Sequence, residues 1–349
     1  MAGSSVLRPT SCVALMLVWA FRLWAALAAP YKAEASKEDD LKAKYERWMA
    51  RYGRSYGDEK EKEQRFRIYS ANVGFIDQVN SLNYSYKLMD NQFADLSNEE
   101  FRARHLGYGS HAPKMPTPFV PSHCVHNAHV PDTIDWRTKG AVTPVKDQAE
   151  CGSCWAFSTV AAIEGINQIK TGELVSLLEQ ELVDCDLTSS GCQGGWPDTA
   201  FECIKENGGI ASEKDYPYAG IDSACNIVEL GDHAATISGY RTVPAKNQTC
   251  LKAAAANQPI SVAIDAAGME FQFYASGIFD GPCGMQSNHA VTVVGYGREK
   301  ESEFWIVKNS WGTTWGEHGY IRMKRNVAEK EGLCGIAMNA FYPTKEKYI

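Results

Sequence analysis

Apolar and aromatic side chains recur with a helical period in the charged N-terminal part of the chain, between Leu41 and Asn80. In the first half of this stretch they lie three and four residues apart, as on one face of an amphipathic helix. These positions are Tyr45, Trp48, Met49 and Tyr52. A second helix is predicted to follow within the same stretch, because its residues are also charged and permit a helix.

The periodicity stops in the segment Gly107–Val130, where Gly, Pro and His are frequent. This composition is typical of an exposed linker that proteases can cut, and we place the start of a mature chain near Val130. The pattern then predicts a helix over Ser153–Lys170, which Thr171-Gly172 ends. The run SLLEQELVDCD predicts a second, short helix, and GCQGG marks a tight loop.

Strand-like runs dominate after Gly239, and Gly-rich turns separate them. They are ISVAI, HAVTVVGYG, EFWIVKNSW and GYIRM. Helices first and a curled antiparallel sheet later are typical of the α+β class, and we expect two lobes that face each other across a cleft. The sequence contains no internal repeat or low-complexity tract.

The first 29 residues have the features of a secretory signal peptide. Arg8 precedes the apolar run Cys12–Phe21, and the small residues Ala25–Ala29 offer a cleavage site near Ala28 or Ala29. Arg22 interrupts the apolar run and leaves it shorter than the roughly twenty residues that a membrane span needs. We therefore expect a chain that enters the secretory pathway without a retained membrane anchor.

Length and composition support this organisation. The chain has 349 residues, of which 44% are hydrophobic, so we expect two or three compact units with a sizeable core. The formal net charge is −7, and no basic stripe is present. Nucleic-acid binding therefore has no support in the sequence.

The candidate chemistry begins in the run QAECGSCWAF, which spans Gln148–Phe157. Here Cys154 directly precedes a predicted apolar helix, and Cys151 and Cys154 form a C-x-x-C pair. Such a pair supports three chemistries, namely thiol–disulfide exchange, half of a zinc site, or nucleophilic catalysis. The residues around the pair have to distinguish among them.

Two polar residues further along the chain favour nucleophilic catalysis. His289 opens the strand-like run AVTVVGYG, 135 residues after Cys154, and Asn309 follows the run FWIVK, 155 residues after Cys154. A histidine can activate a thiol, and an amide can orient the histidine without adding a charge. Taken alone, His289 would more often be a structural residue of a strand, and Asn309 a turn residue.

The chain resembles the papain family of cysteine proteases, in particular the cathepsin-L-like enzymes of plants. The resemblance rests on the C-G-[SA]-C-[WY] signature with a distant His and Asn. It also includes the E-R-F-N-I-N pattern of the propeptides, with Tyr69 in place of Phe. That pattern is carried by Glu61, Arg65, Tyr69, Asn72, Ile76 and Asn80. A further propeptide element, G-x-N-x-F-x-D, is matched by Asn91, Phe93 and Asp95, with Met89 at the glycine position.

The resemblance implies a zymogen. Residues 1–29 would be the signal peptide, 38–106 a helical inhibitory propeptide domain, and 107–129 a linker with the maturation site. Residues 130–349 would form the papain-like peptidase domain, with a helical lobe and an antiparallel, barrel-like lobe on either side of the active-site cleft.

The resemblance also implies a role for each catalytic residue. Cys154 would attack the scissile carbonyl, His289 would transfer protons, and Asn309 would orient His289. A helix N-terminus stabilises an anion by about 0.3 to 1 kcal/mol, so we expect imidazolium His289 to supply most of the stabilisation of the Cys154 thiolate. The side chain of Gln148 and the backbone N–H of Cys154 would form the oxyanion hole. Ala149 replaces a glycine that is usual in the family.

The same resemblance places the substrate in the cleft. The substrate backbone would pair with Gly194 and Gly195, and Trp311 would line the leaving-group side. The remaining candidate binding residues are Trp196, Pro197, Ala263, Asn288, Ala290 and Asn339. We expect an apolar main pocket that prefers a bulky hydrophobic or aromatic residue two positions before the cut.

Secretion favours disulfides, and the family pattern implies the pairs Cys151–Cys192, Cys185–Cys225 and Cys283–Cys334, with Cys154 free. Cys12 leaves with the signal peptide, and Cys124 falls in the linker. Cys203 and Cys250 are either buried thiols or a fourth bridge. Asn83 and Asn247 begin glycosylation triplets, of which only the second would remain after maturation.

Two other classes of function stay open at this point. A thiol–disulfide oxidoreductase would use Cys151 and Cys154 but would leave His289 and Asn309 unexplained. A noncatalytic storage or inhibitor homologue would need a lost nucleophile or base. For the protease we expect no cofactor and no metal. Its partners would be protein and peptide substrates, its own propeptide and cystatin-like inhibitors, and it would be a monomer in a vacuole, a lysosome-like compartment or the extracellular space.

Overall fold

The computed structural model describes residues 37–109, 130–214, 217–226 and 233–346. The predicted signal peptide lies outside the described residues, as do Cys12, Cys124 and residues 110–129 of the predicted linker. Contacts within the chain divide it into two compact units, with the boundary between Ser70 and Ala71. Each unit is described on its own below.

The first unit packs its helices through aromatic side chains. One helix covers residues 37–52 and the next, α2, covers Glu59–Ser81. Tyr45 lies 5.0 Å from Tyr69 between ring centroids, and Trp48 lies 5.3 Å from Tyr69. All three rings are buried, so the spacing of three and four residues marks the packed face, as predicted.

The second unit begins within α2, where two asparagines hold the segment that follows the helix. Asn72 donates to the carbonyl oxygens of Ala94 and Leu96, both at 2.9 Å. Asn80 donates to the carbonyl of Leu88 and accepts from its N–H, at 2.8 and 2.9 Å. The segment contains strand β1 (Tyr86–Leu88) and helix α3 (Asn98–His105), which a capping box begins.

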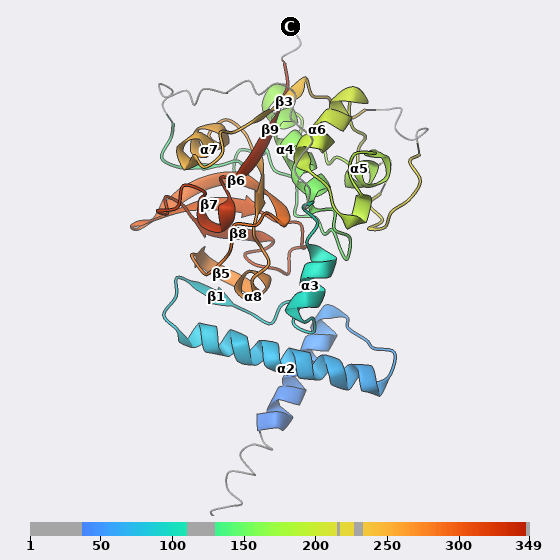
Figure 1. Cartoon of the computed structure of the whole chain (residues 1–349), viewed down its shortest axis with the longest axis vertical. Helices are drawn as coiled ribbons and strands as arrows, with labels where there is room; N and C mark the ends of the chain where they lie inside the picture. The colour runs from blue at the N-terminus through green and yellow to red at the C-terminus, as the bar shows by residue number, and fades with distance from the viewer. Residues whose placement is uncertain (1–36, 110–129, 215–216, 227–232, 347–349) are drawn as a thin grey trace, which may run out of the picture. The chain divides into compact units, whose positions relative to one another are not determined.

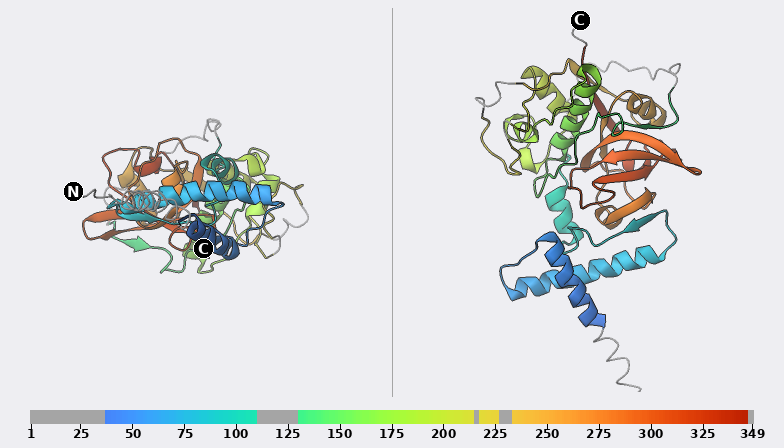
Figure 2. Two further views of the ribbon diagram at one scale, coloured as in Figure 1. Left: turned by 90° about the horizontal axis from the view of Figure 1, so that it is seen from below. Right: turned by 180° about the vertical axis from the view of Figure 1, so that it is seen from behind.

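Three helices form one lobe of the second unit: α4 (Cys154–Thr171), α5 (Glu179–Cys185) and α6 (Pro197–Glu206). Gly172 ends α4 in the left-handed conformation with φ 86°, as the sequence predicted. Trp155 and Ile163 of α4 and Phe201 of α6 are fully buried in the same apolar cluster. Figure 1 shows these helices grouped on one side of the strands β6 to β8, and the view from behind in Figure 2 shows the same separation.

A nine-stranded sheet forms the other lobe. Its strands run in the order β1-β5-β8-β7-β6-β4-β9-β3, and β2 pairs with β6 outside this path. The bounds not yet given are β2 Ile134–Asp135, β3 Gly239–Thr242, β4 Ile260–Ile264, β5 Tyr274–Phe279, β6 His289–Glu299, β7 Ser302–Lys308, β8 Tyr320–Lys324 and β9 Asn339–Thr344. Helices α7 (Gln248–Ala255) and α8 (Met269–Gln272) lie between strands in the sequence.

The α+β class is confirmed, but one strand pair differs from the antiparallel sheet that the sequence predicted. β5 and β8 are parallel. This is possible because β6 and β7 intervene in the sequence and supply the long connection that a parallel pair requires. The sheet is open, since its strand order ends at β1 and β3.

The cysteines form the three disulfides that the family resemblance implied, Cys151–Cys192, Cys185–Cys225 and Cys283–Cys334. Cys203 is a free thiol, whereas Cys250 is disulfide-bonded. A bridge between Cys203 and Cys250 is therefore excluded. Asn83 is exposed, and Asn247 caps α7 by accepting from the N–H of Cys250. None of the described helices is long and apolar enough to cross a membrane.

Candidate active site

Three candidate catalytic side chains come together where the two lobes meet. Cys154 is the first residue of α4, His289 is the first residue of β6, and Asn309 directly follows β7. The backbone N–H of Ala290, next to His289, donates to Cys154 Sγ at 3.4 Å. The antiparallel pairing of β6 with β7 brings Asn309 alongside the start of β6.

The imidazole of His289 is held on one side only. Its Nε2 lies 2.8 Å from Asn309 Oδ1, and Trp311 stacks over the ring at 4.5 Å between centroids. Its Nδ1 is buried and has no hydrogen-bond partner among the described residues. One nitrogen is therefore fixed by the amide, while the other remains available for a proton transfer.

Burial determines the charge state of this pair. Cys154 and His289 are both 0% exposed. Burial raises the pKa of Cys154 to about 11, although backbone N–H groups of Ala290 and Gly107 oppose the rise. Burial also lowers the pKa of His289 to about 4, against the hydrogen bond that its Nε2 makes to Asn309 Oδ1. The covered site thus favours a neutral thiol and a neutral imidazole, and the predicted ion pair requires an uncovered site.

The site is covered by Leu106–Gly109, which we call the cleft segment. Tyr108 donates through its backbone N–H to the carbonyl of Asn288 at 3.1 Å. Gly109 donates to the carbonyl of Gly195 at 3.1 Å, and Gly195 donates to that of Gly107 at 3.0 Å. The segment runs parallel to the chain at Gly195 and joins the two walls of the cleft. A Cβ at Gly107 would come within 1.7 Å of the carbonyl oxygen of Gly152, so only glycine fits.

Gln148, the candidate oxyanion-hole residue, is fully buried and oriented by three hydrogen bonds. Its Oε1 accepts from Ser310 Oγ at 2.6 Å. Its Nε2 donates to the carbonyls of Cys151 at 2.8 Å and His105 at 3.2 Å. A carbonyl from the end of α3 therefore accepts a hydrogen bond from the Gln148 side-chain amide. The neighbouring Ala149 has φ 54°, a left-handed conformation that a glycine would adopt without strain.

The predicted pocket residues of the sheet lobe form one row. Ala290, Ala263 and Asn339 are direct cross-strand neighbours on β6, β4 and β9, so their side chains share one face. Asn339 Nδ2 donates to Ser287 Oγ at 3.0 Å. The row thus has two methyl groups at one end and a neutral amide at the other.

Opposite this row, Gly194, Gly195 and Trp196 lead into α6, which Pro197 begins. The indole of Trp196 lies close to Gly109, whose Cβ would come within 2.4 Å of the ring. Asn288 binds its own lobe, because its Oδ1 accepts from the N–H of Ala266 and its Nδ2 donates to Asp265. Its carbonyl contacts the cleft segment, so its side chain is not what the segment binds.

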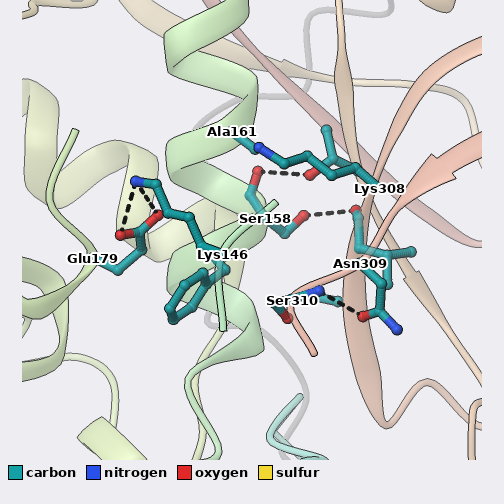
Figure 3. Close-up of a pocket in the computed structure, with 11 residues that line it drawn as sticks. Lys146, Ser158, Ala161, Glu179, Lys308, Asn309 and Ser310 are labelled. Carbon is teal, nitrogen blue, oxygen red and sulfur yellow. Dashed lines mark hydrogen bonds and ion pairs between the residues drawn. The ribbon is translucent and has the colours of Figure 1, made fainter. Parts of the chain in front are cut away.

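A buried polar cluster that the sequence did not predict lies beside Asn309 (Figure 3). Lys146 Nζ contacts Glu179 at 2.9 Å and Glu164 at 3.2 Å. Lys308, next to Asn309, donates to Thr143 at 2.9 Å. These residues come from loops and elements far apart in the sequence, so no local motif marks them.

The two alternative chemistries of the C-x-x-C pair find no support. Cys151 is bonded to Cys192 rather than to Cys154. Among the described residues, no group of three or more His, Cys, Asp or Glu could hold a metal ion.

Comparison with known proteins identifies related sequences and structures. Residues 130–344 match the sequence model of the papain family cysteine protease, and residues 45–101 match that of the cathepsin propeptide inhibitor domain (I29). The senescence-specific cysteine protease SAG39 of Oryza sativa subsp. indica is 49% identical over 316 residues, which cover 89% of this chain and 92% of that protein.

Solved structures of precursors match over most of the chain. A recombinant stem bromelain precursor superposes with a TM-score of 0.82 and 45% identity, covering 88% of this chain and 99% of the other. The proform of Amb a 11, a ragweed pollen allergen and cysteine protease, gives a TM-score of 0.81 and 40% identity, covering 89% of this chain and 96% of the other. Each of these two matches therefore extends beyond residues 130–344 into the N-terminal part of the chain.

Proposed function

Because the chain belongs to the papain family of cysteine proteases and is made with an inhibitory propeptide, we propose that it is an endopeptidase with the triad Cys154, His289 and Asn309. One observation carries this assignment: the N–H of Ala290 contacts Cys154 Sγ, and the adjacent His289 has one nitrogen held by Asn309 and the other unpartnered. The arrangement has a nucleophile, a base and a residue that orients the base.

In the proposed reaction, Cys154 Sγ forms a bond to the scissile carbonyl carbon, and the amide nitrogen leaves with a proton from His289. The product is a thioester between the enzyme and the acyl part of the substrate. Water then attacks the thioester, with His289 as general base, and Cys154 is released. Once the propeptide has left, the thiol and the imidazole are exposed, and the desolvation that favours their neutral forms is reduced.

The negative oxygen of each tetrahedral intermediate is assigned to the Gln148 side-chain amide and the Cys154 backbone N–H. The support for Gln148 is that its Nε2 already donates to a carbonyl of the propeptide, that of His105 at the end of α3. Loss of one such donor costs roughly 3 to 4 kcal/mol of transition-state stabilisation in comparable sites.

The substrate chain is assigned to the walls that hold the cleft segment, Gly194 and Gly195 on one side and the β6–β4–β9 row on the other. The main pocket is lined by Trp196, Pro197, Ala263, Ala290 and Asn339, and Trp311 lies on the leaving-group side. A bulky hydrophobic or aromatic residue is preferred two positions before the cut, because the nearest walls are an indole and two methyl groups.

The enzyme is assigned to the secretory pathway, with a vacuole, a lysosome-like compartment or the extracellular space as its destination. Glycosylation is assigned to Asn83 in the propeptide and Asn247 in the mature domain. The mature enzyme acts as a monomer, and cystatin-like proteins inhibit it. Acid removes the propeptide, with the cut in the linker 107–129.

The decisive experiment uses protein matured in acid and a set of fluorogenic dipeptidyl amides. Wild type hydrolyses the amides with an aromatic or bulky aliphatic residue in the second position, and Cys154→Ala hydrolyses none of them. Cys203→Ala is the matched control, because Cys203 is a free thiol that takes no part in the triad. Full activity of Cys154→Ala would refute the triad, and a first preference for Arg or Glu would refute the pocket.

A further inference from the structure

Tyr108 of the cleft segment lies where a substrate residue would lie. Its backbone connects both walls, through a bridge to Gly195 and a hydrogen bond to the carbonyl of Asn288. The flanking residues Gly107 and Gly109 have no side chains, so Tyr108 is the one residue of these three that can fill a side-chain pocket. At this position of the cleft the propeptide therefore carries a tyrosine.

The wall beside Tyr108 contains an unusual carboxylate. Asp198 is the second residue of α6, three positions after Gly195, and is 5% exposed. Its Oδ1 is buried and has no hydrogen-bond partner, and neither has Nε1 of the neighbouring Trp196. The carboxylate accepts hydrogen bonds from the backbone N–H groups of Asp198 and Thr199. Its Oδ1 still has no partner, and because a buried carboxylate oxygen without a partner is costly, Oδ1 can accept a hydrogen bond from a ligand.

Electrostatics connects the carboxylate with the tyrosine. Burial raises the pKa of the Tyr108 phenol, and the negative charge of Asp198 raises it further. Burial also raises the pKa of Asp198 above its usual value. The phenol stays protonated and can donate, and the carboxylate can accept. In the precursor Tyr108 is not hydrogen-bonded to Asp198. The cleft segment runs parallel to the chain at Gly195, and this direction is consistent with the missing hydrogen bond.

We propose that Asp198 is a specificity-determining residue whose free carboxylate oxygen accepts a hydrogen bond from the tip of the substrate side chain, so that the main pocket selects tyrosine over phenylalanine. This inference rests on the proposed function. The walls suit the ring through Trp196, Ala263 and Ala290, and Asp198 recognises the hydroxyl. Tyrosine can donate a hydrogen bond to the charged carboxylate, whereas phenylalanine leaves that acceptor unpaired. We therefore expect tyrosine to be preferred over phenylalanine by about tenfold.

The test compares two fluorogenic dipeptidyl amides that differ only in Tyr or Phe at the second position before the cut. For each variant the ratio of the two kcat/KM values is measured with matured enzyme, so that the fraction of active protein cancels. Wild type is expected to prefer Tyr about tenfold. Asp198→Ala is expected to bring the ratio within about twofold of unity through a higher Tyr KM, with Phe hydrolysis retained.

Two further variants keep the result decisive. Glu202→Gln removes a charge from the same helix at a residue paired with Lys205, and its ratio must match wild type. Asp198→Asn keeps the shape and one acceptor oxygen but removes the charge, and its ratio must fall between those of wild type and Asp198→Ala. An equal wild-type ratio, or one that Asp198→Ala leaves unchanged, overturns the proposal. If neither amide is hydrolysed in a Cys154-dependent manner, the proposed function itself has failed.

Discussion

The propeptide contacts the peptidase domain in two chemically different regions. In the first, which we call the anchor, residues 85–101 add strand β1 beside β5 and pack Phe93 and Phe101 against Trp311. In the second, the cleft segment Leu106–Gly109 crosses the active site through backbone hydrogen bonds and two glycines. Large apolar side chains bind in the anchor, whereas the cleft segment works by close backbone approach.

This difference separates affinity from inhibition. Burial of aromatic rings stabilises the anchor, and such burial does not depend on pH. The cleft segment contacts the active site through its backbone. In the covered site, burial favours the neutral forms of Cys154 and His289. The anchor therefore keeps the propeptide bound, and the cleft segment makes the bound state inactive.

The largest expected effect comes from removing an anchor ring. Phe101 is 0% exposed, and truncation of a buried Phe costs about 3 to 5 kcal/mol. Phe101→Ala is expected to increase the rate of Cys154 alkylation in the unprocessed zymogen at neutral pH by about 100-fold or more. The rate is measured by mass spectrometry with Cys203 as the internal reference thiol.

The matched control for this experiment is Arg102→Ala, which removes an exposed side chain from the same helix. Its alkylation rate should equal that of wild type. If Phe101→Ala also leaves the rate unchanged, the anchor does not hold the propeptide, and the separation of the two regions is wrong.

The second prediction concerns pH and distinguishes the regions by their titrating groups. In the covered site burial lowers the pKa of His289 to about 4 from 6.5, so a state in which His289 is exposed to solvent binds more protons between these values. Uncovering therefore becomes easier as pH falls through 6.5, by up to about 3 kcal/mol near pH 4, and the effect levels off below that pH. Above 6.5 His289 contributes no pH dependence.

Hydrogen exchange measures this opening directly. The N–H groups of Gly109 and Gly195 are hydrogen-bonded within the covered cleft, so their corrected exchange rates report uncovering. In a Cys154→Ser zymogen, which cannot mature itself, the rates should rise by about 100-fold from pH 6.5 to 4. In the zymogen that carries both Cys154→Ser and His289→Gln, these exchange rates should rise much less over the same pH range. The remainder reports other titrating groups. Equal slopes in the two proteins would contradict the prediction.

The local elements of this fold could be predicted from the sequence. The helix that Gly172 ends, the short helix α5 and the three disulfides follow from patterns within short segments or from the family resemblance. The residues of the proposed triad were identified from the same signals, because each stands at the edge of an apolar run. The helices and their ends depend on neighbours in the sequence, whereas the disulfide pairs and the roles of the proposed triad follow from the family resemblance.

Features that depend on distant neighbours could not be predicted. The parallel pairing of β5 with β8 is set by a crossover that no local pattern marks. The neutral state of Cys154 depends on burial beneath a segment that has no periodicity. Asp198 looks in the sequence like any acidic residue of a first helical turn, and only the fold leaves its oxygen buried without a partner beside the cleft.

The smallest expected effect comes from the cleft segment itself. Gly107→Ala places a Cβ against the Gly152 carbonyl, which as backbone cannot move aside, so the segment has to shift away from Cys154. Because the anchor remains intact, we expect alkylation of Cys154 in the zymogen to rise only about tenfold, with the thermal midpoint of the zymogen changed by less than about 2 °C. Gly74→Ala is the control, since nothing lies within 4 Å of the Cβ that it would add in α2. A midpoint that falls as far in Gly107→Ala as in Phe101→Ala would mean that the cleft segment also contributes affinity, and the two regions would then share one role.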